Sequence, residues 1–187
     1  MTAFVITIPD QTDRITRLKA DFKIQGITDY QIIQGEQLPY SVVTSISRSH
    51  KNIVRMAQLN NMPHVLIMEN DVRFPAPDGY SHYISKQPQH DDWDLYLAGC
   101  YCPHSIDYEN IIGFSGLHCY MVNKRFYDTF ISINEHKHLD SELTGKGKYI
   151  LCNPITAVQY EGWSTNNRRF ENYDNLLEGK RVYGINC

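Results

Sequence analysis

The chain has 187 residues, of which 42% are hydrophobic and 21% are charged, and its formal net charge is −3. This length and composition indicate one globular domain with enough apolar side chains to build a core. The small net charge excludes a global field that would recruit nucleic acid or an acidic membrane surface, so any anion has to be bound locally.

Neither a secretion signal nor a membrane span is expected. The apolar residues 4–8 are too short for a signal peptide, and no apolar stretch approaches membrane-spanning length. The chain is therefore expected to be soluble and cytoplasmic. Its five cysteines are an odd number, which argues against a disulfide framework. Cys100, Cys102 and His104 lack the usual spacing of paired zinc ligands, so we expect small buried thiols there.

Strand and helix patterns alternate along the chain. Strands are predicted over residues 3–8, 30–34, 65–68, 95–97 and 117–122, and helices over residues 11–25, 45–60 and 124–131. Two short elements are expected over residues 141–143 and 149–158, with an irregular segment over residues 75–88. The alternation predicts an α/β fold, a mainly parallel mixed sheet with helices on both faces.

The stretch from residue 164 to residue 187 is polar, with little apolar periodicity. It is expected to be a loop or a loosely docked tail after a domain that spans residues 1–163. A further hypothesis is that it forms an active-site lid that orders when a donor binds.

A pair of acids ends the most apolar run of the chain. Glu69 and Asp71 follow Val65-Leu66-Ile67-Met68, and in an extended segment two such side chains leave the same face. Ligands bind at the carboxyl ends of buried parallel strands, and hard oxygen ligands suit Mg²⁺ or Mn²⁺ bridging a diphosphate. The alternative is that residues 69–71 are a polar turn.

Several further motifs occur in a fixed order. They are Phe4-Val5-Ile6-Thr7-Ile8 with Asp13-Arg14, Ser49-His50, Glu69-Asn70-Asp71-Val72-Arg73-Phe74, Trp93-Asp94-Leu95-Tyr96-Leu97-Ala98-Gly99, His118-Cys119-Tyr120-Met121-Val122, His138-Leu139-Asp140, and the positions Pro154, Gln159 and Ser164. In order and spacing, the run from residue 4 to about residue 164 resembles glycosyltransferase family 25, the lipooligosaccharide and collagen galactosyltransferase type.

The resemblance implies a single GT-A type (Rossmann-like) domain, a nucleotide-diphosphate sugar donor, a divalent cation and inversion at the anomeric carbon. The expected reaction moves a hexose, with galactose and a UDP-sugar as leading candidates, to a saccharide or protein hydroxyl. The expected cofactor is Mn²⁺ or Mg²⁺, and nucleic acid is not expected as a partner.

The resemblance also implies roles for the residues that match the motifs of the family. Glu69 and Asp71 are the expected metal ligands, and the residues expected at the donor are Ile8, Arg14, Asp71, Gln159 and Ser164.

Each remaining role has an alternative. Asp140 is the candidate base that takes the acceptor proton, or else an N-cap for residues 141–143. Arg14 binds the diphosphate or a nucleotide ring edge, or else is a solvated helix charge. His50 orders the loop beside the acidic strand or acts as a base. Gln159 and Ser164 contact donor or acceptor, or are a polar strand end.

Two positions depart from the family pattern. Asn70 replaces the middle acid of a Glu-Asp-Asp element, and His138-Leu139 replaces Pro-Val before the acid. Asn70 supports an alternative function, a degenerate domain that binds a sugar or a partner without turnover. A metal-dependent phosphohydrolase ranks last, because it needs more than two acids.

Overall fold

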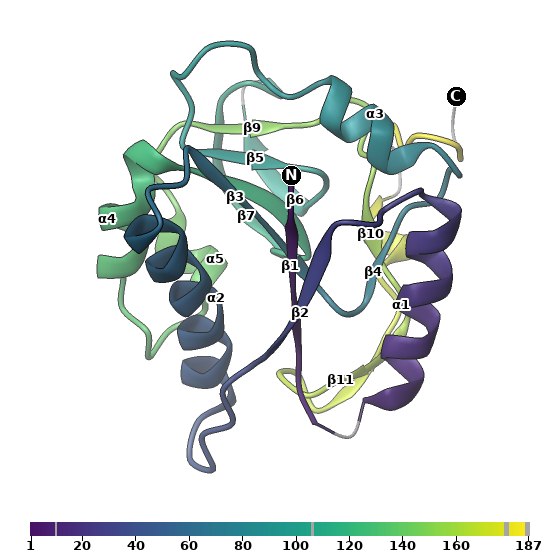
Figure 1. Cartoon of the computed structure of the whole chain (residues 1–187), viewed down its shortest axis with the longest axis horizontal. Helices are drawn as coiled ribbons and strands as arrows, with labels where there is room; N and C mark the ends of the chain where they lie inside the picture. The colour runs from purple at the N-terminus through teal and green to yellow at the C-terminus, as the bar shows by residue number, and fades with distance from the viewer. Residues whose placement is uncertain (10, 106, 178–179, 186–187) are drawn as a thin grey trace.

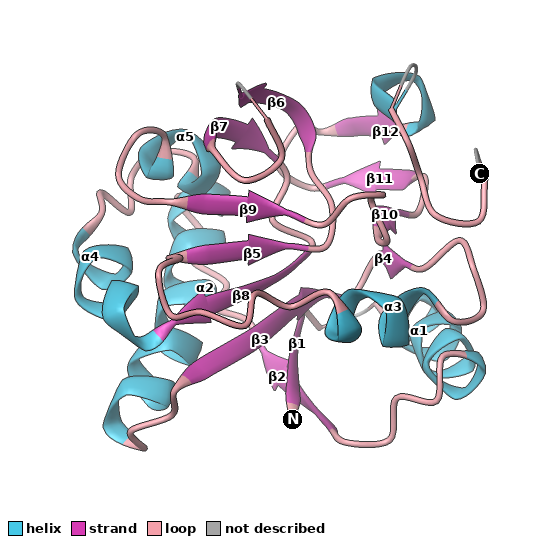
Figure 2. Cartoon of the chain, turned by 90° about the horizontal axis from the view of Figure 1, so that it is seen from above, coloured by secondary structure: helices cyan, strands magenta, loops and turns pink. Residues whose placement is uncertain are grey.

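The computed structural model describes residues 1–9, 11–105, 107–177 and 180–185. Its centre is an eight-stranded sheet (Figure 2). The strands are β1 (Ala3–Thr7), β2 (Tyr30–Gln34), β3 (His64–Glu69), β5 (Leu95–Leu97), β6 (Tyr101–Ser105), β7 (Ile111–Ser115), β8 (Cys119–Asn123) and β9 (Tyr149–Leu151). They lie in the order β2-β1-β3-β8-β5-β9-β7-β6, and β7 and β8 run opposite to the others. Six of the eight strands run in one direction, so the sheet is mixed and, by strand direction, mainly parallel, as the sequence predicts.

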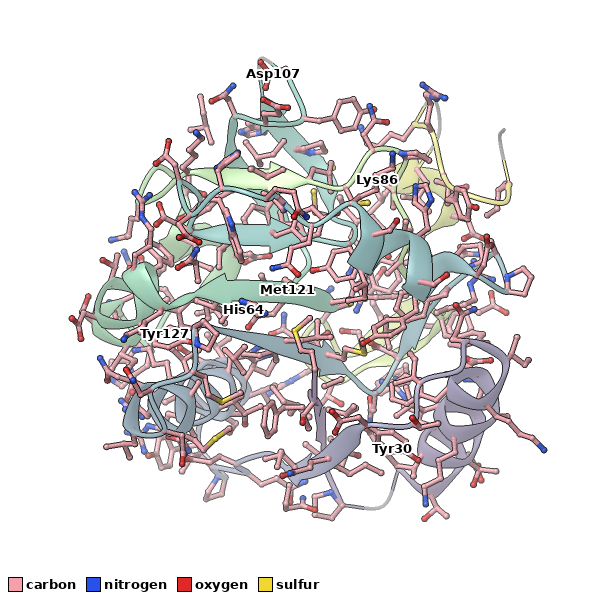
Figure 3. All side chains as sticks on the ribbon, turned by 45° about the horizontal axis from the view of Figure 1, so that its top comes forward. Tyr30, His64, Lys86, Asp107, Met121 and Tyr127 are labelled. Atoms are coloured by element: carbon pink, nitrogen blue, oxygen red, sulfur yellow. The ribbon has the colours of Figure 1, made fainter. Side chains whose placement is uncertain are left out.

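The central strand β3 is covered on both faces. Val65 and Ile67 belong to one apolar cluster, Leu66 and Met68 to the other, and all four side chains are fully buried. Alternating side chains along a strand point to opposite faces, so a continuous apolar run suits a sheet between two layers. Figure 3 shows side chains filling both sides of the sheet, with Met121 on the neighbouring strand β8.

Helices form the two outer layers (Figure 1). α2 (Val42–Leu59), α4 (Tyr127–Ser132) and α5 (Leu139–Leu143) cover one face, and α1 (Thr12–Ile24) and α3 (Gly79–Ser85) cover the other. A 3₁₀ turn, η1 (Lys124–Phe126), precedes α4. This arrangement confirms the predicted α/β class.

The segment over residues 75–88, predicted to be irregular, contains α3, so that prediction was wrong. Tertiary packing accounts for the helix, because Tyr83 is fully buried and its ring stacks on Tyr96 at 4.6 Å. The antiparallel pair β6–β7 was also missed. Its register is irregular near His104, and Pro103 and Gly113 interrupt the apolar alternation on which a strand prediction depends.

The chain after β9 adds small sheets beside the main one. β10 (Val158–Gln159) pairs with β4 (Val72–Arg73), and β11 (Gly162–Ser164) pairs with β12 (Arg169–Glu171). η2 (Asp174–Leu177) follows. The described part of the expected tail therefore carries secondary structure, and the β11–β12 hairpin crosses the predicted boundary at Ser164. Within the described residues, no helix has the length and apolarity that a membrane span requires.

Close backbone packing after β5 positions β10. The amides of Thr156 and Ala157 both donate to the Ala98 carbonyl oxygen, at 2.8 and 3.2 Å. A Cβ on Gly99 would lie 1.9 Å from the Ala157 oxygen, so only glycine allows this approach. The contact fixes the segment that delivers Gln159 to the edge of β4.

We predict that Gly99→Ala lowers the free energy of unfolding by about 3 kcal/mol or more, because backbone atoms must shift. Chemical denaturation measures this change. Gly162→Ala is the control, since its Cβ would meet only Arg14 Nη2, at an ordinary 3.5 Å. Equal stability of the two variants would contradict the packing described for residues 98–99.

Candidate functional site

A cleft of about 540 Å³ opens where β1 and β3 end. In Figure 1 this is the lower end of the molecule, where β1 ends and β11 lies. Residues from α2, α5 and the β11–β12 hairpin complete its walls. The cleft contains every residue that the sequence nominated for the site, namely Ile8, Arg14, Glu69, Asp71, Asp140, Gln159 and Ser164.

The acid pair lies in the floor of the cleft. Glu69 is the last residue of β3, and the Asp71 side chain is only 16% exposed. Burial and the negative charge of Glu69 raise the pKa of Asp71 to about 6, while Arg14 and Gln159 act in the opposite direction. The two carboxylates therefore repel each other in a place that water reaches poorly, and a cation between them would relieve that repulsion.

Arg14 connects the acid pair to the hairpin. It lies in the first turn of α1, and its Nη1 is 3.3 Å from Asp71 Oδ2. Its Nη2 donates to the Trp163 carbonyl oxygen at 2.7 Å. The side chain is 22% exposed, so it is a positioned cation at the cleft wall and not a solvated helix charge.

Gln159 holds the two acids from the opposite side. Its Nε2 lies 3.4 Å from Glu69 Oε2 and from both oxygens of Asp71. The β10–β4 pairing sets its position, and its backbone amide donates to the Tyr101 hydroxyl at 2.9 Å. These contacts make Gln159 part of the acid cluster.

The oxygen ligands available in the cleft suit a divalent cation that is also coordinated by a substrate. Glu69 and Asp71 supply carboxylate oxygens, and Mg²⁺ is commonly held by one or two carboxylates together with substrate phosphates. The described residues contain no group of three or more His, Cys, Asp or Glu side chains that could hold a metal by themselves. A cation here would therefore need oxygens from its substrate to complete its coordination.

Asn70 braces the loop between β1 and α1. It is 6% exposed, and its Nδ2 donates to Thr7 Oγ1 at 3.0 Å and to Gln11 Oε1. The amide group thus ties the end of β3 to the end of β1. Asn70 is the donor in both bonds, so its amide has a structural role at this position.

His50 is a buried link between the cleft and the core. Its side chain is 2% exposed, with Nε2 3.3 Å from Glu69 Oε1 and Nδ1 2.6 Å from the Tyr120 hydroxyl. Both ring nitrogens are thus engaged. The geometry fits the first of the two roles considered for His50, which is to order the end of the acidic strand.

Asp140 lies across the cleft on α5. Its Oδ2 accepts from the Gly116 amide at 3.1 Å and its Oδ1 from the Ser141 amide at 2.8 Å. The alternative that Asp140 is the N-cap was wrong, because α5 begins at Leu139 and His138 is its N-cap residue. Two backbone donors fix the orientation of this carboxylate at the cleft wall.

Two residues nominated for the donor have simpler surroundings. Ile8 follows β1 and lines both the main cleft and a smaller cavity of about 270 Å³ beside α1. Ser164 ends β11, and its hydroxyl accepts from the Asn167 amide at 3.1 Å.

The cleft residues that the sequence analysis did not nominate include Tyr101, Glu171 and Tyr173. The rings of Tyr101 and Tyr173 stack at 5.0 Å. Tyr101 belongs to the missed strand β6, and Glu171 and Tyr173 lie in the stretch that was expected to be a tail. Only the three-dimensional path of the chain brings them to the acids.

The described cysteines divide into two groups. Cys100, Cys119 and Cys152 are buried free thiols, whereas Cys102 is exposed. Burial raises the pKa of the Cys100 thiol to about 12, which keeps it protonated and unreactive. Cys187 lies outside the described residues.

Comparisons with known proteins identify the fold. No family model matches the sequence, and no curated protein matches it significantly. The catalytic domain of Drosophila β1,4-galactosyltransferase 7, in complex with xylobiose, is similar with a TM-score of 0.51 and 12% identity over 93% of this chain and 72% of that chain.

Two further solved structures are similar. A glycosyltransferase involved in glycosylation of the major capsid of PBCV-1 gives a TM-score of 0.50 and 13% identity, over 82% of this chain and 81% of that one. HddC from Yersinia pseudotuberculosis gives a TM-score of 0.52 and 12% identity, over 81% of this chain and 89% of that one. These likenesses show that the chain has the GT-A fold of glycosyltransferases. Membership of family 25 stays a prediction.

The raised pKa of Asp71 predicts that this residue destabilises the metal-free protein at neutral pH. An aspartate has an ordinary pKa of 3.8, so between about pH 4 and pH 6 the folded state retains a proton that the unfolded state releases. Stability falls as the pH rises through this window, by up to about 3 kcal/mol. We expect Asp71→Asn to melt at a higher temperature than the wild type at pH 7.5 without metal.

That difference should narrow as the pH approaches 4, where wild-type Asp71 is itself neutral. Glu109→Gln, which removes an exposed carboxylate in the loop after β6, should leave the pH dependence unchanged. A lower melting temperature for Asp71→Asn at pH 7.5 would show that the Arg14 ion pair outweighs burial and repulsion.

Proposed function

We propose that the protein is a cation-dependent, inverting glycosyltransferase of the family 25 type. It transfers a hexose, with galactose as the leading candidate, from a nucleotide-diphosphate sugar to a saccharide or protein hydroxyl. The observation that carries the proposal is the convergence, in one cleft of a GT-A fold, of the acid pair Glu69 and Asp71 with Arg14 on one side and Asp140 on another.

The acid pair and Arg14 are assigned to the donor diphosphate. Asp71 and Glu69 would hold Mn²⁺ or Mg²⁺, and a bound cation stabilises negative charge that develops on the leaving diphosphate. With a pKa of about 6, Asp71 is ionised at neutral pH and available as a ligand. Arg14 supplies a fixed guanidinium beside it, which suits bidentate binding of a phosphate.

Asp140 is assigned as the general base. In a single displacement, the acceptor oxygen forms a bond to the anomeric carbon while the bond from that carbon to the diphosphate oxygen breaks. The acceptor proton passes to the Asp140 carboxylate as the new bond forms. Hydrogen bonds from the Gly116 and Ser141 amides hold that carboxylate in one orientation, which favours proton transfer to a defined place.

The supporting residues fit this assignment. Ile8 would pack against the nucleoside at the end of β1, and Gln159 and Ser164 would hydrogen-bond to the donor. The alternative function is a degenerate domain that binds a sugar or a partner without turnover. We favour the transferase because Asn70 has a structural role, with its amide bonded to Thr7 and Gln11. Nothing in the proposal requires an acid at position 70.

Measurements of turnover and of donor binding distinguish the role of the base Asp140 from that of the residues that bind the donor. We expect Asp140→Asn to lower kcat by about 10²- to 10⁴-fold, the range for loss of a general base. The rise in melting temperature that a nucleotide sugar and Mn²⁺ produce together should persist, since the donor does not need Asp140. A panel of nucleotide-diphosphate sugars and saccharide acceptors, with Mn²⁺ or EDTA, measures both quantities.

Glu142→Gln provides a matched control in the same helix. Its carboxylate pairs with Lys137 at 3.5 Å, outside the cleft, so both readouts should remain at the wild-type level. NMR of the product would report inversion at the anomeric carbon. Release of nucleotide at an unchanged rate by Asp140→Asn would contradict the assignment of the base.

A further inference from the structure

The β11–β12 hairpin has two chemically different faces. Directly opposite residues of an antiparallel pair share a face, and the pairs here are Gly162 with Glu171 and Trp163 with Phe170. Trp163 and Phe170 are 59% and 63% exposed. The Glu171 side chain is only 14% exposed, and both Glu171 and Trp163 line the cleft, whereas Phe170 does not. The polar face of the hairpin is therefore a wall of the site.

The hairpin connects the two chemical ends of the cleft. At its start, the Trp163 carbonyl oxygen accepts from Arg14, which is itself 3.3 Å from Asp71. At its turn, Asn166 Nδ2 lies 3.4 Å from Nδ1 of His138, two residues before Asp140. Groups on the polar face between these ends thus lie where a sugar would extend from the diphosphate toward the base.

One carboxylate oxygen of Glu171 is available to accept hydrogen bonds from a ligand. Its Oε1 accepts from Arg169 Nε at 2.7 Å and from Asn167 Nδ2 at 2.8 Å. Among the described residues, no hydrogen bond ends on Oε2. The same two partners lower the pKa of Glu171, so the carboxylate is ionised at neutral pH and acts only as an acceptor. Gly162, opposite on the hairpin, has no side chain to fill the adjacent space.

Tyr173 adds an aromatic surface close to the acids. Its ring stacks on Tyr101, whose hydroxyl accepts the backbone amide of Gln159. Burial raises the pKa of Tyr173, and the negative charges of Asp71, Glu171 and Glu69 raise it further. Tyr173 lines the same cleft as the acid pair. The wall formed by Glu171 and Tyr173 is thus next to the position assigned to the diphosphate.

The chemistry of this wall suits a sugar ring. Arg169 offsets the charge of Glu171, and Glu171 Oε2 is left as an acceptor. Hexose hydroxyls donate to a carboxylate, and the C–H face of the ring packs on an aromatic side chain. We propose that Glu171 and Tyr173 form the subsite that recognises the donor hexose, with Glu171 Oε2 accepting hydrogen bonds from its hydroxyls. This inference rests on the proposed transferase function, which it deepens by assigning sugar selection to the hairpin.

Calorimetry with Mn²⁺ tests the subsite by comparing a nucleotide sugar with its nucleotide. The probes are UDP-galactose against UDP, and GDP-mannose against GDP, for whichever base binds. In Glu171→Gln, the ratio of the nucleotide-sugar Kd to the nucleotide Kd should rise about tenfold, the loss expected for one hydrogen bond to a charged group. The Kd of the nucleotide alone should stay within about twofold.

Glu161→Gln is the matched control. This nearby carboxylate also bonds to an asparagine, Asn172, at 3.3 Å, but it lies outside the cleft, so the ratio should not change. An equal loss for nucleotide and nucleotide sugar in Glu171→Gln would overturn the subsite, because it would show that Glu171 only positions the hairpin. No change in either Kd would overturn it as well.

Saccharide binding without nucleotide separates this inference from the proposed function. Ligand-observed NMR with methyl galactoside and methyl mannoside requires neither metal nor turnover. If wild-type protein binds no nucleotide but binds a saccharide, and Glu171→Gln loses that binding, the transferase proposal fails while the sugar subsite stands. Binding of neither nucleotide nor saccharide would overturn both.

Discussion

Two carboxylates held close together in a partly buried place are the feature on which the rest of this structure depends. Burial raises the pKa of Asp71, and the negative charge of Glu69 raises it further, because the two carboxylates repel each other. The surrounding residues oppose that repulsion, since Arg14 pairs with Asp71, His50 with Glu69, and the amide of Gln159 with both. Such strain at a cleft is typical of a site that keeps charge for a ligand at the expense of stability in its absence.

The fold brings these residues together from distant parts of the chain. β1 and β3 are parallel neighbours, so their carboxyl ends meet at one edge and deliver the loop that begins at Ile8 and the acid pair. The close packing of Gly99 against Ala157 leads β10 to the edge of β4 and delivers Gln159. The β11–β12 hairpin then closes the cleft between Arg14 and the His138 segment. The geometry of the site is therefore as much a property of the last strands as of the acid-terminated one.

Sequence patterns predicted the parts of this site that follow from local rules. The apolar run of β3 and the two acids after it stand out because strand periodicity and burial are local signals, and α1, α2 and β5 follow from similar signals. The positions of side chains that depend on tertiary packing could not be predicted from the sequence. Glu171 and Tyr173 come from a polar stretch without periodicity, and their place in the cleft depends on hairpin pairing and on stacking with Tyr101. The sequence shows that Asn70 removes a charge from the expected cation site, and only the coordinates show where its amide donates.

The central claim is that Asp71, ionised, holds a cation that a nucleotide needs, and calorimetric titration of a nucleoside diphosphate tests it most directly. The titration compares wild type and Asp71→Asn, with Mn²⁺ or EDTA, at pH 7.5 and pH 5.0. With an Asp71 pKa of about 6, wild-type affinity should require Mn²⁺ and fall about tenfold between pH 7.5 and pH 5.0. Asp71→Asn should bind weakly at both pH values. Equal affinity in EDTA, or in Asp71→Asn, would contradict the account.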